Sequence, residues 1–141
     1  MQTVTKELKF EAAHRLINGY HGKCRNNHGH SWVVFVTVKL LPGASLNEFG
    51  FVKDFGDFSP LKGWIDDNLD HATVVSSEDS PFLMWLDAAE QRYFTIQGNP
   101  TSENLSKLIF EKASLLLNDS SCVVSEVRIK ETCTSEASYA L

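Results

Sequence analysis

The sequence predicts an α+β domain in which strands at both ends of the chain enclose two helices. Side chains of alternating polarity, the pattern of half-buried strands, occupy residues 3–16, 30–41 and 122–131. Apolar residues recur at helical spacing after Ser59 and again after Asn99. The predicted order is therefore strand, strand, helix, helix, strand, strand, within one domain that covers residues 1–141.

Composition narrows the possible functions. The 141 residues carry a net charge of −5, with 43% hydrophobic and 22% charged residues, as in ordinary globular proteins. This charge argues against a nucleic-acid-binding protein, which would need a basic face. The first residues lack the pattern of a signal peptide, and no apolar run approaches the ~20 residues that span a bilayer. Three cysteines, an odd number, suggest a reducing compartment. We expect a cytoplasmic protein without a nucleic-acid or membrane partner.

The first strand carries a histidine at the end of its apolar face. Leu8, Phe10, Ala12 and His14 alternate with polar residues and so share one face. A lone histidine in such a place is usually a core residue held by a backbone partner. The turn-forming residues 18–22 predict a return of the chain that brings further histidines beside it.

His28 and His30 open the second strand and point to the same side, with Cα atoms roughly 6–7 Å apart. With His14 they form a candidate zinc site, and His21 in the intervening loop is a weaker candidate ligand. Cys24 leaves two alternatives open. As a fourth ligand it would close a structural site, whereas beside an open, catalytic zinc it would act as base or nucleophile. A site without metal is the third alternative.

The second strand is apolar on both faces. Trp32, Val34 and Val36 share the side of the histidines, but Val33 and Phe35 lie on the other. A strand of this kind usually has protein on both sides, so we expect the second cover to come from another subunit.

The middle of the chain is expected to begin with a loop, residues 47–58, in which the short apolar piece 49–52 closes the hairpin. Ser59-Pro60 then starts a helix with an apolar stripe. Asp70-His71 at its end is either a solvated helix terminus or a proton-transfer pair. Residues 73–98 are the least informative and contain a possible short helix from Ser80 and a brief strand at 93–96.

The C-terminal third begins with a clear helix after residues 99–103, which residues 118–121 end. The following strand, residues 122–131, ends in Glu131, and residues 138–141 are expected to form a final short strand. An ionisable group at the end of an apolar strand face is costly to bury without a partner, so Glu131 is a candidate ligand-binding residue.

Five segments together carry a resemblance to a known family. They are residues 10–16 (FEAAHRL), Cys24-x3-His28-Gly29-His30, Leu69-Asp70-His71, residues 99–103 (NPTSE) and residues 130–134 (KETCT). In this order they resemble the 6-pyruvoyltetrahydropterin synthase / 6-carboxytetrahydropterin synthase family over nearly the whole chain. The resemblance implies the tunnelling fold, a four-stranded antiparallel sheet with two helices between strands two and three. Three subunits then close a barrel and two barrels stack into a hexamer.

The resemblance also implies roles for individual residues. His14, His28 and His30 match zinc ligands, and Cys24 matches the catalytic thiol. Asp70 and His71 match its proton-relay partners, which come from a neighbouring subunit. Glu131 matches the carboxylate that anchors the pterin, while Thr101 and Glu103 match residues that line its pocket or only cap a helix. Lys23 and Arg25 are either triphosphate contacts or solvated loop charges.

The spacing within the motif selects a branch of the family. Three residues separate Cys24 from His28, as in the queuosine-pathway branch, whereas the pyruvoyl-forming branch typically has five. The implied enzyme is a carbon–carbon lyase that converts 7,8-dihydroneopterin triphosphate to 6-carboxy-5,6,7,8-tetrahydropterin, acetaldehyde and triphosphate, with a Zn²⁺ cofactor. The alternatives are a 6-pyruvoyltetrahydropterin synthase, a folate-pathway variant, or a zinc-stabilised pterin-binding module without activity.

Overall fold

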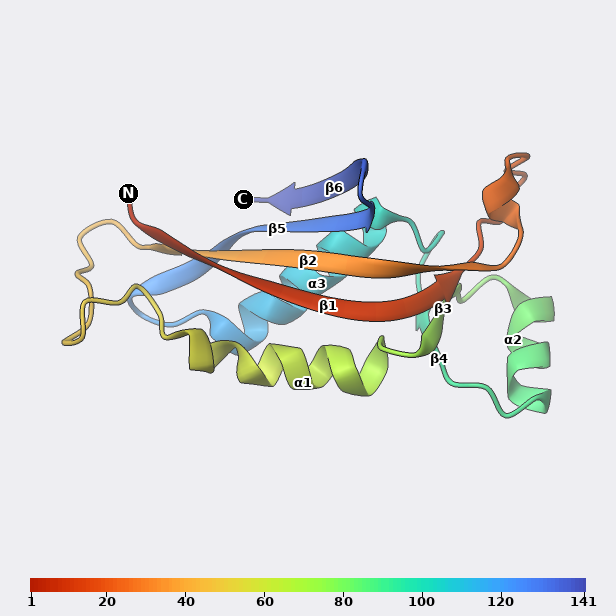
Figure 1. Cartoon of the computed structure of the whole chain (residues 1–141), viewed down its shortest axis with the longest axis horizontal. Coiled ribbons are helices and arrows are strands. Elements are labelled where there is room, and N and C mark those ends of the chain that lie inside the picture. Colours follow the sequence, from red (N-terminus) through yellow and green to blue (C-terminus); the bar gives the residue numbers. More distant parts are fainter.

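One mixed sheet backed by two helices forms the body of the molecule (Figure 1). The computed structural model describes residues 1–141. The strands lie in the order β4-β3-β1-β2-β5-β6. None of the helices combines the length and the apolar character that crossing a bilayer requires. The elements are β1 (Thr3–His14), η1 (Lys23–Arg25), β2 (His28–Leu40), η2 (Phe55–Phe58), α1 (Ser59–Asn68), β3 (Ala72–Ser76), α2 (Ser80–Ala88), β4 (Tyr93–Ile96), α3 (Ser102–Leu117), β5 (Cys122–Thr132) and β6 (Ser135–Ala140).

The predicted α+β class is confirmed, but the sheet has six strands rather than four. The additional strands, β3 and β4, flank α2 and pair in parallel, β3 with the end of β1 and β4 with β3. The chain reaches this position through His71, which adopts the left-handed backbone conformation with φ of 59°. The short helix after Ser80 and the strand at 93–96 were predicted, whereas β3 was not.

The hairpin of β1 and β2 fixes the positions of the three histidines. The two strands are antiparallel, with His14 opposite His28 and Ala12 opposite His30. The first strand ends at His14 rather than at residue 16, and the second begins at His28 rather than at His30. All three side chains therefore lie at the same end of the sheet.

The core lies between one face of the sheet and the two long helices. Along β1 and β2 the buried residues alternate with exposed or half-buried ones, as the polarity pattern predicts. Trp32 on β2 is fully buried, as are Leu61 of α1 and Ile109 of α3. On the opposite face, Val33 and Phe35 of β2 are only half-buried.

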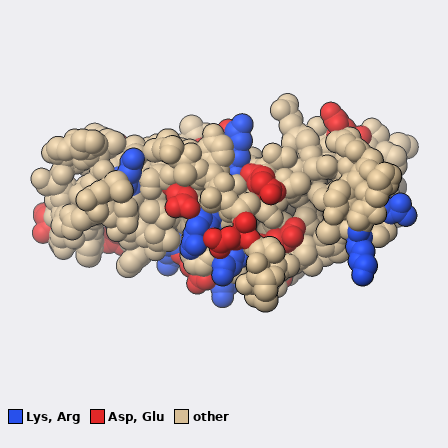
Figure 2. Space-filling model, turned by 90° about the horizontal axis from the view of Figure 1, so that it is seen from above, with Lys and Arg blue, Asp and Glu red and all other residues tan.

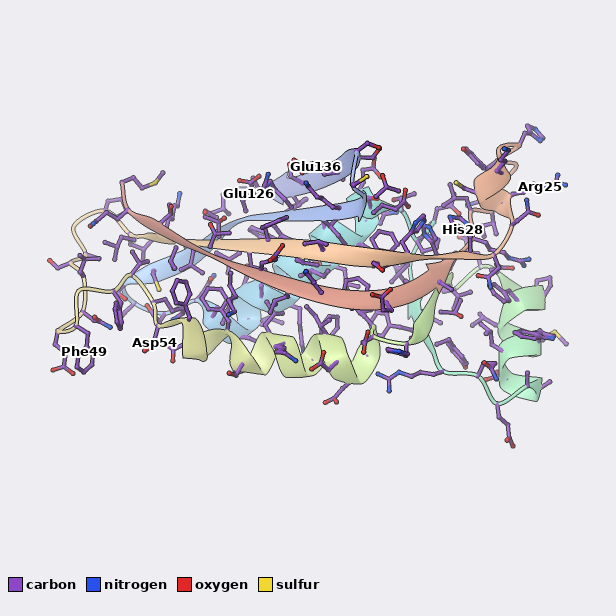
Figure 3. The ribbon with its side chains drawn as sticks, in the orientation of Figure 1. Arg25, His28, Phe49, Asp54, Glu126 and Glu136 are labelled. Atoms are coloured by element: carbon purple, nitrogen blue, oxygen red, sulfur yellow. The ribbon has the colours of Figure 1, made fainter.

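One local prediction was wrong and another had the wrong bounds. Residues 49–52 form no strand that closes the hairpin, because the Asn47 side chain accepts hydrogen bonds from the backbone of Phe49 and Phe51 and folds them into a tight loop. Figure 3 shows Phe49 and Asp54 at the end of the molecule farthest from His28. The last strand runs over Ser135–Ala140 instead of 138–141, since it forms a hairpin directly with β5.

Candidate functional site

The side chains of His14, His28 and His30 converge at the end of the sheet. Their ligand atoms all lie within 4.8 Å of one another. The ring centroid of His14 is 4.6 Å from that of His28 and 5.1 Å from that of His30. The Nε2 atom of each ring is buried and has no hydrogen-bond partner. Three buried nitrogen atoms without partners are unusual, because buried polar atoms are nearly always paired.

Backbone carbonyls orient two of the rings. Nδ1 of His14 donates to the carbonyl oxygen of Pro100 at 2.6 Å, and Nδ1 of His28 donates to that of Asn26 at 2.7 Å. A carbonyl oxygen only accepts, so Nδ1 carries the proton in both rings and Nε2 presents a lone pair. Burial lowers the pKa of His14 and of His30 below the ordinary histidine value, which favours the neutral form.

The three imidazoles fit a metal ion. Neutral Nε2 donors that converge, each with its Nδ1 free to bind an outer partner, are the arrangement that Zn²⁺ uses in open sites. Glu131 lies beside them, with Oε1 3.2 Å from Nε2 of His14 and 3.6 Å from Nε2 of His30. These contacts lie outside hydrogen-bonding geometry, so the carboxylate does not satisfy either nitrogen. The weaker candidate ligand, His21, is exposed and does not join the cluster.

Trp32 forms the inner wall of the cluster. Its ring packs edge-on against His14 and His30, with centroid distances of 5.1 and 5.3 Å. Its indole N–H donates to the carbonyl oxygen of Ala12 at 3.1 Å, which holds the ring in place. The sequence predicts Trp32 on the same face as the histidines but gives no sign of this role.

A cavity of about 270 Å³ adjoins the histidine cluster. It brings together five of the predicted site residues, from four separate parts of the chain: His14, Cys24, Thr101, Glu103 and Glu131. Tyr20 and Glu136 also line it and were not predicted. Cys24 is half-buried on η1, and its carbonyl oxygen accepts a hydrogen bond from the backbone of Leu16 at 2.8 Å. A thiol, carboxylates and a candidate metal centre thus face one small space.

The helix α3 begins at the wall of this cavity. Thr101 is the N-cap residue of α3, and its side chain accepts a hydrogen bond from the backbone of Asn104. Capping is one of the two predicted roles of Thr101, and the residue also lines the cavity, as the other role requires. Glu103 lies in the first turn, where a carboxylate also suits the helix dipole.

His71 lines a different cavity of about 510 Å³, together with Glu11, His30, Ser31 and Arg92, and Asp70 lies behind it in contact with Glu11 and His71. Oδ1 of Asp70 accepts from the backbone of Glu11 at 2.8 Å, and Oδ2 lies 2.9 Å from Nδ1 of His71. The Glu11 N–H is the main cause of a lowered pKa for Asp70. The side chain of His71 is 77% exposed. Cys24 and Glu131 do not line this cavity, so His71 and the thiol lie at different cavities of the single chain.

Lys23 and Arg25 are both exposed, on either side of the half-buried Cys24. Figure 3 shows Arg25 and His28 at the same end of the molecule. In Figure 2, acidic and basic side chains intermingle over the middle of the face seen from above, and the end that carries η1 shows basic side chains along one edge and acidic ones along the other.

Comparison with known proteins gives a consistent result. The family model described as 6-pyruvoyl tetrahydropterin synthase matches residues 3–141. A curated relative from Rickettsia bellii, 6-carboxy-5,6,7,8-tetrahydropterin synthase, is 32% identical over 134 residues, which cover 91% of this chain and 92% of the relative. The protein of the same name from Haemophilus influenzae is 31% identical over 143 residues, with 99% of both chains covered.

A solved structure supports the fold. The 6-pyruvoyl tetrahydropterin synthase of Caenorhabditis elegans superposes with a TM-score of 0.69 at 28% sequence identity, covering 100% of this chain and 97% of that chain. The predicted resemblance and fold class are confirmed by these matches, and so is the prediction of an enzyme. The roles of the individual site residues stay predictions.

Proposed function

The chain belongs to the 6-pyruvoyl tetrahydropterin synthase family, and from this membership we propose that it is a zinc-dependent 6-carboxy-5,6,7,8-tetrahydropterin synthase. The reaction would convert 7,8-dihydroneopterin triphosphate to 6-carboxytetrahydropterin, acetaldehyde and triphosphate, as a step of the queuosine pathway. The observation that carries the proposal is the set of three unpartnered Nε2 atoms beside a cavity lined by Cys24 and Glu131.

His14, His28 and His30 would hold the zinc ion. Two of the rings already have the tautomer that offers Nε2, and Trp32 and the strand backbone hold the donors in place before a cation arrives. A bound Zn²⁺ supplies Lewis acidity toward a hydroxyl or carbonyl oxygen of the substrate. With only three protein ligands, one position stays free for that oxygen.

The carboxylates of the cavity would bind the pterin. Its guanidine-like edge presents paired N–H donors, and Glu131 offers two oxygen acceptors in matching geometry. Thr101 and Glu103 lie on the wall of the same cavity and would bound the ring. A planar heterocycle held there would place its side chain toward the histidine cluster and Cys24.

Proton transfer would fall to Cys24 and to the pair of Asp70 and His71. Cys24 lines the cavity that adjoins the histidine cluster, and it would remove a proton from the substrate side chain. His71 would return a proton as the carbon–carbon bond breaks. Asp70 holds Nδ1 of His71, which leaves Nε2 of that ring to donate or accept.

The separation of His71 from Cys24 within one chain supports a shared site in an oligomer. We propose that Asp70 and His71 serve the cavity of a neighbouring subunit in a hexamer, a dimer of trimers. The sheet leaves surfaces for such contacts: Val33 and Phe35 are half-covered on the outer face, and β1 lacks a partner over its first nine residues on the side of β3. Within this assembly, residues 1–141 would act as one domain.

The three-residue spacing between Cys24 and His28 favours the carboxy-forming branch over the pyruvoyl-forming one. A structural zinc site with Cys24 as fourth ligand is the competing proposal, and it would describe a binding module without turnover. The names of the two curated relatives support the carboxy-forming synthase. A cytoplasmic location stays a prediction.

One experiment tests the proposal. Purified protein would be incubated with 7,8-dihydroneopterin triphosphate, and the products identified by mass spectrometry together with an acetaldehyde assay. Wild type should release acetaldehyde and form the carboxypterin. Cys24→Ala should keep its zinc and its assembly but turn over about 10²–10⁴-fold more slowly, the usual contribution of a positioned acid or base. Zinc loss in Cys24→Ala would assign the thiol to the metal instead, and a pyruvoyl product would move the chain to the other branch.

A further inference from the structure

The side chain of Asn99 pairs with the backbone three residues after the end of β1. Its Oδ1 accepts from the N–H of Ile17 at 2.7 Å, and its Nδ2 donates to the carbonyl oxygen of the same residue at 3.3 Å. The Asn99 side chain thus forms with Ile17 the two hydrogen bonds that the backbone of a neighbouring strand would form. The two residues are 82 positions apart, so this pairing joins two segments that the rest of the sheet does not connect.

The next residue, Pro100, contacts the candidate metal ligand directly. Its carbonyl oxygen accepts from Nδ1 of His14 at 2.6 Å, in a buried position. Asn99 and Pro100 together therefore hold the backbone at Ile17 and the imidazole at His14. One contact is at His14, the last residue of β1, and the other is three residues later at Ile17.

The N-terminus of α3 holds Asn99 and Pro100 in place. The carbonyl oxygen of Asn99 accepts from the N–H of Thr101 at 2.8 Å and from Nδ2 of Asn104 at 2.8 Å. The ring of Pro100 restricts its own φ, and the residue is buried. The carbonyl that orients His14 consequently belongs to a rigid corner and not to a flexible loop.

We propose that Asn99 is a positioning residue for the metal ligand His14. This inference rests on the proposed function, because it concerns the residue that the zinc site would use. Without the amide, the segment after His14 loses its only link to residues 99–100 besides the Pro100 contact itself, and the imidazole is freer to rotate. The Nδ1–H tautomer that leaves Nε2 open would then be less populated. Partners in the outer shell of a metal site typically change metal affinity by 10–100-fold when removed.

The chain contains a matched control at the other end of α3. Oδ1 of Asn118 accepts from the N–H of Val124 at 2.7 Å, the same kind of partly buried bond between a side-chain amide and the backbone. Asn118 caps the C-terminal end of α3, a full helix away from Asn99. Replacing it removes a comparable bond without touching the histidine cluster, so the comparison separates positioning from general stability.

The test uses the full chain as wild type, Asn99→Ala and Asn118→Ala. Zinc affinity would be measured by competition with a chromogenic chelator, and the unfolding midpoint of the metal-free protein by urea titration. The ¹⁵N spectrum of the imidazoles, recorded without metal, reports the tautomer of His14. Both variants should lose similar stability. Asn99→Ala should bind zinc about tenfold more weakly and lose Nδ1–H population at His14, while Asn118→Ala should match wild type in both.

Equal zinc affinity and equal tautomer populations in the two variants would overturn the proposal. If Asn99→Ala does not fold, Asn99→Asp takes its place: it keeps the acceptor for Ile17 and loses the donor. Its added negative charge would strengthen cation binding, so a weaker affinity could only come from lost positioning, and an unchanged tautomer and affinity would again refute the role. A wild type that binds no zinc would refute the proposed function instead, and the metal-free ¹⁵N spectra would still decide the role of Asn99.

Discussion

The ion pair of Arg15 and Asp79 allows a prediction about the inserted segment β3-α2-β4. Nε of Arg15 donates to Oδ2 of Asp79 at 2.7 Å, and Nη2 donates to Oδ1 at 2.6 Å. The guanidinium also lies over the ring of Phe82, 4.5 Å from its centroid. Arg15 directly follows His14, and Asp79 directly precedes α2, so the pair ties the insertion to the strand that carries the first histidine.

Asp79 is more deeply buried than Arg15, so replacing Arg15 should destabilise the protein more than replacing Asp79. The side chain of Asp79 is 4% exposed and that of Arg15 is 30% exposed. Arg15→Ala leaves a buried carboxylate without a partner and should cost about 3 kcal/mol, the lower end of the range for broken buried pairs. Asp79→Ala leaves an arginine that reaches water and should cost about 1–2 kcal/mol. The double variant should be less destabilised than the sum of the two, by about 1–2 kcal/mol.

Urea unfolding of the metal-free protein at one fixed concentration would measure these differences. Lys62→Ala is the matched control: Nζ of Lys62 lies 2.6 Å from Asp66, an equally short contact, but both groups are on the surface. Its midpoint should not change measurably, since exposed pairs contribute little. The reasoning is refuted if Arg15→Ala unfolds at the same midpoint as Lys62→Ala, or if the single effects simply add.

Three further predictions concern metal, assembly and acid. Wild type should carry about one zinc per chain and the His28→Ala, His30→Ala double variant almost none, by elemental analysis; a fully loaded double variant would exclude this site. Light scattering should give a hexamer, and a monodisperse monomer would contradict shared sites. Burial alone would raise the pKa of Asp119, but Lys53 and the backbone of residues 121 and 122 lower it overall. The Asp119 carboxylate therefore resists protonation in the folded protein. Its contribution to the free energy of unfolding is present above about pH 4 and is lost at lower pH. Asp119→Asn should be less stable than wild type at neutral pH by about 1 kcal/mol, a difference that should shrink in acid.

The histidine cluster could be predicted because it depends on local geometry. Alternation along a strand places His28 and His30 on one face, and a hairpin brings His14 opposite His28. Neither step needs information from the rest of the chain. The same reasoning places Trp32 beside the rings, although its role as a wall follows only from the packing.

What the sequence did not predict depends on contacts between distant segments. Pro100 orients His14 across 86 residues, and proline before a helix has a sufficient local explanation as a helix-start signal. The strand β3 has only five residues and pairs with three residues of β1, too short a stretch to show a periodicity. The positions of Asn99 and Asp79 likewise became informative only when their partners at Ile17 and Arg15 were known.

The end of β1 explains why one chain offers two incomplete halves of the proposed site. Glu11 and His14 are three residues apart, so their side chains point to opposite faces of the strand. The backbone of Glu11 binds both Asp70 and His71, on the side of the larger cavity. His14 points to the other side, toward Cys24 and Glu131. His71 and Cys24 therefore line two different cavities of one chain, although His30 of the cluster lies on the wall of the larger one. If both act on one substrate, as proposed, His71 of a second copy would complete the cavity at Cys24, and the oligomer would then be needed for the chemistry as well as for stability.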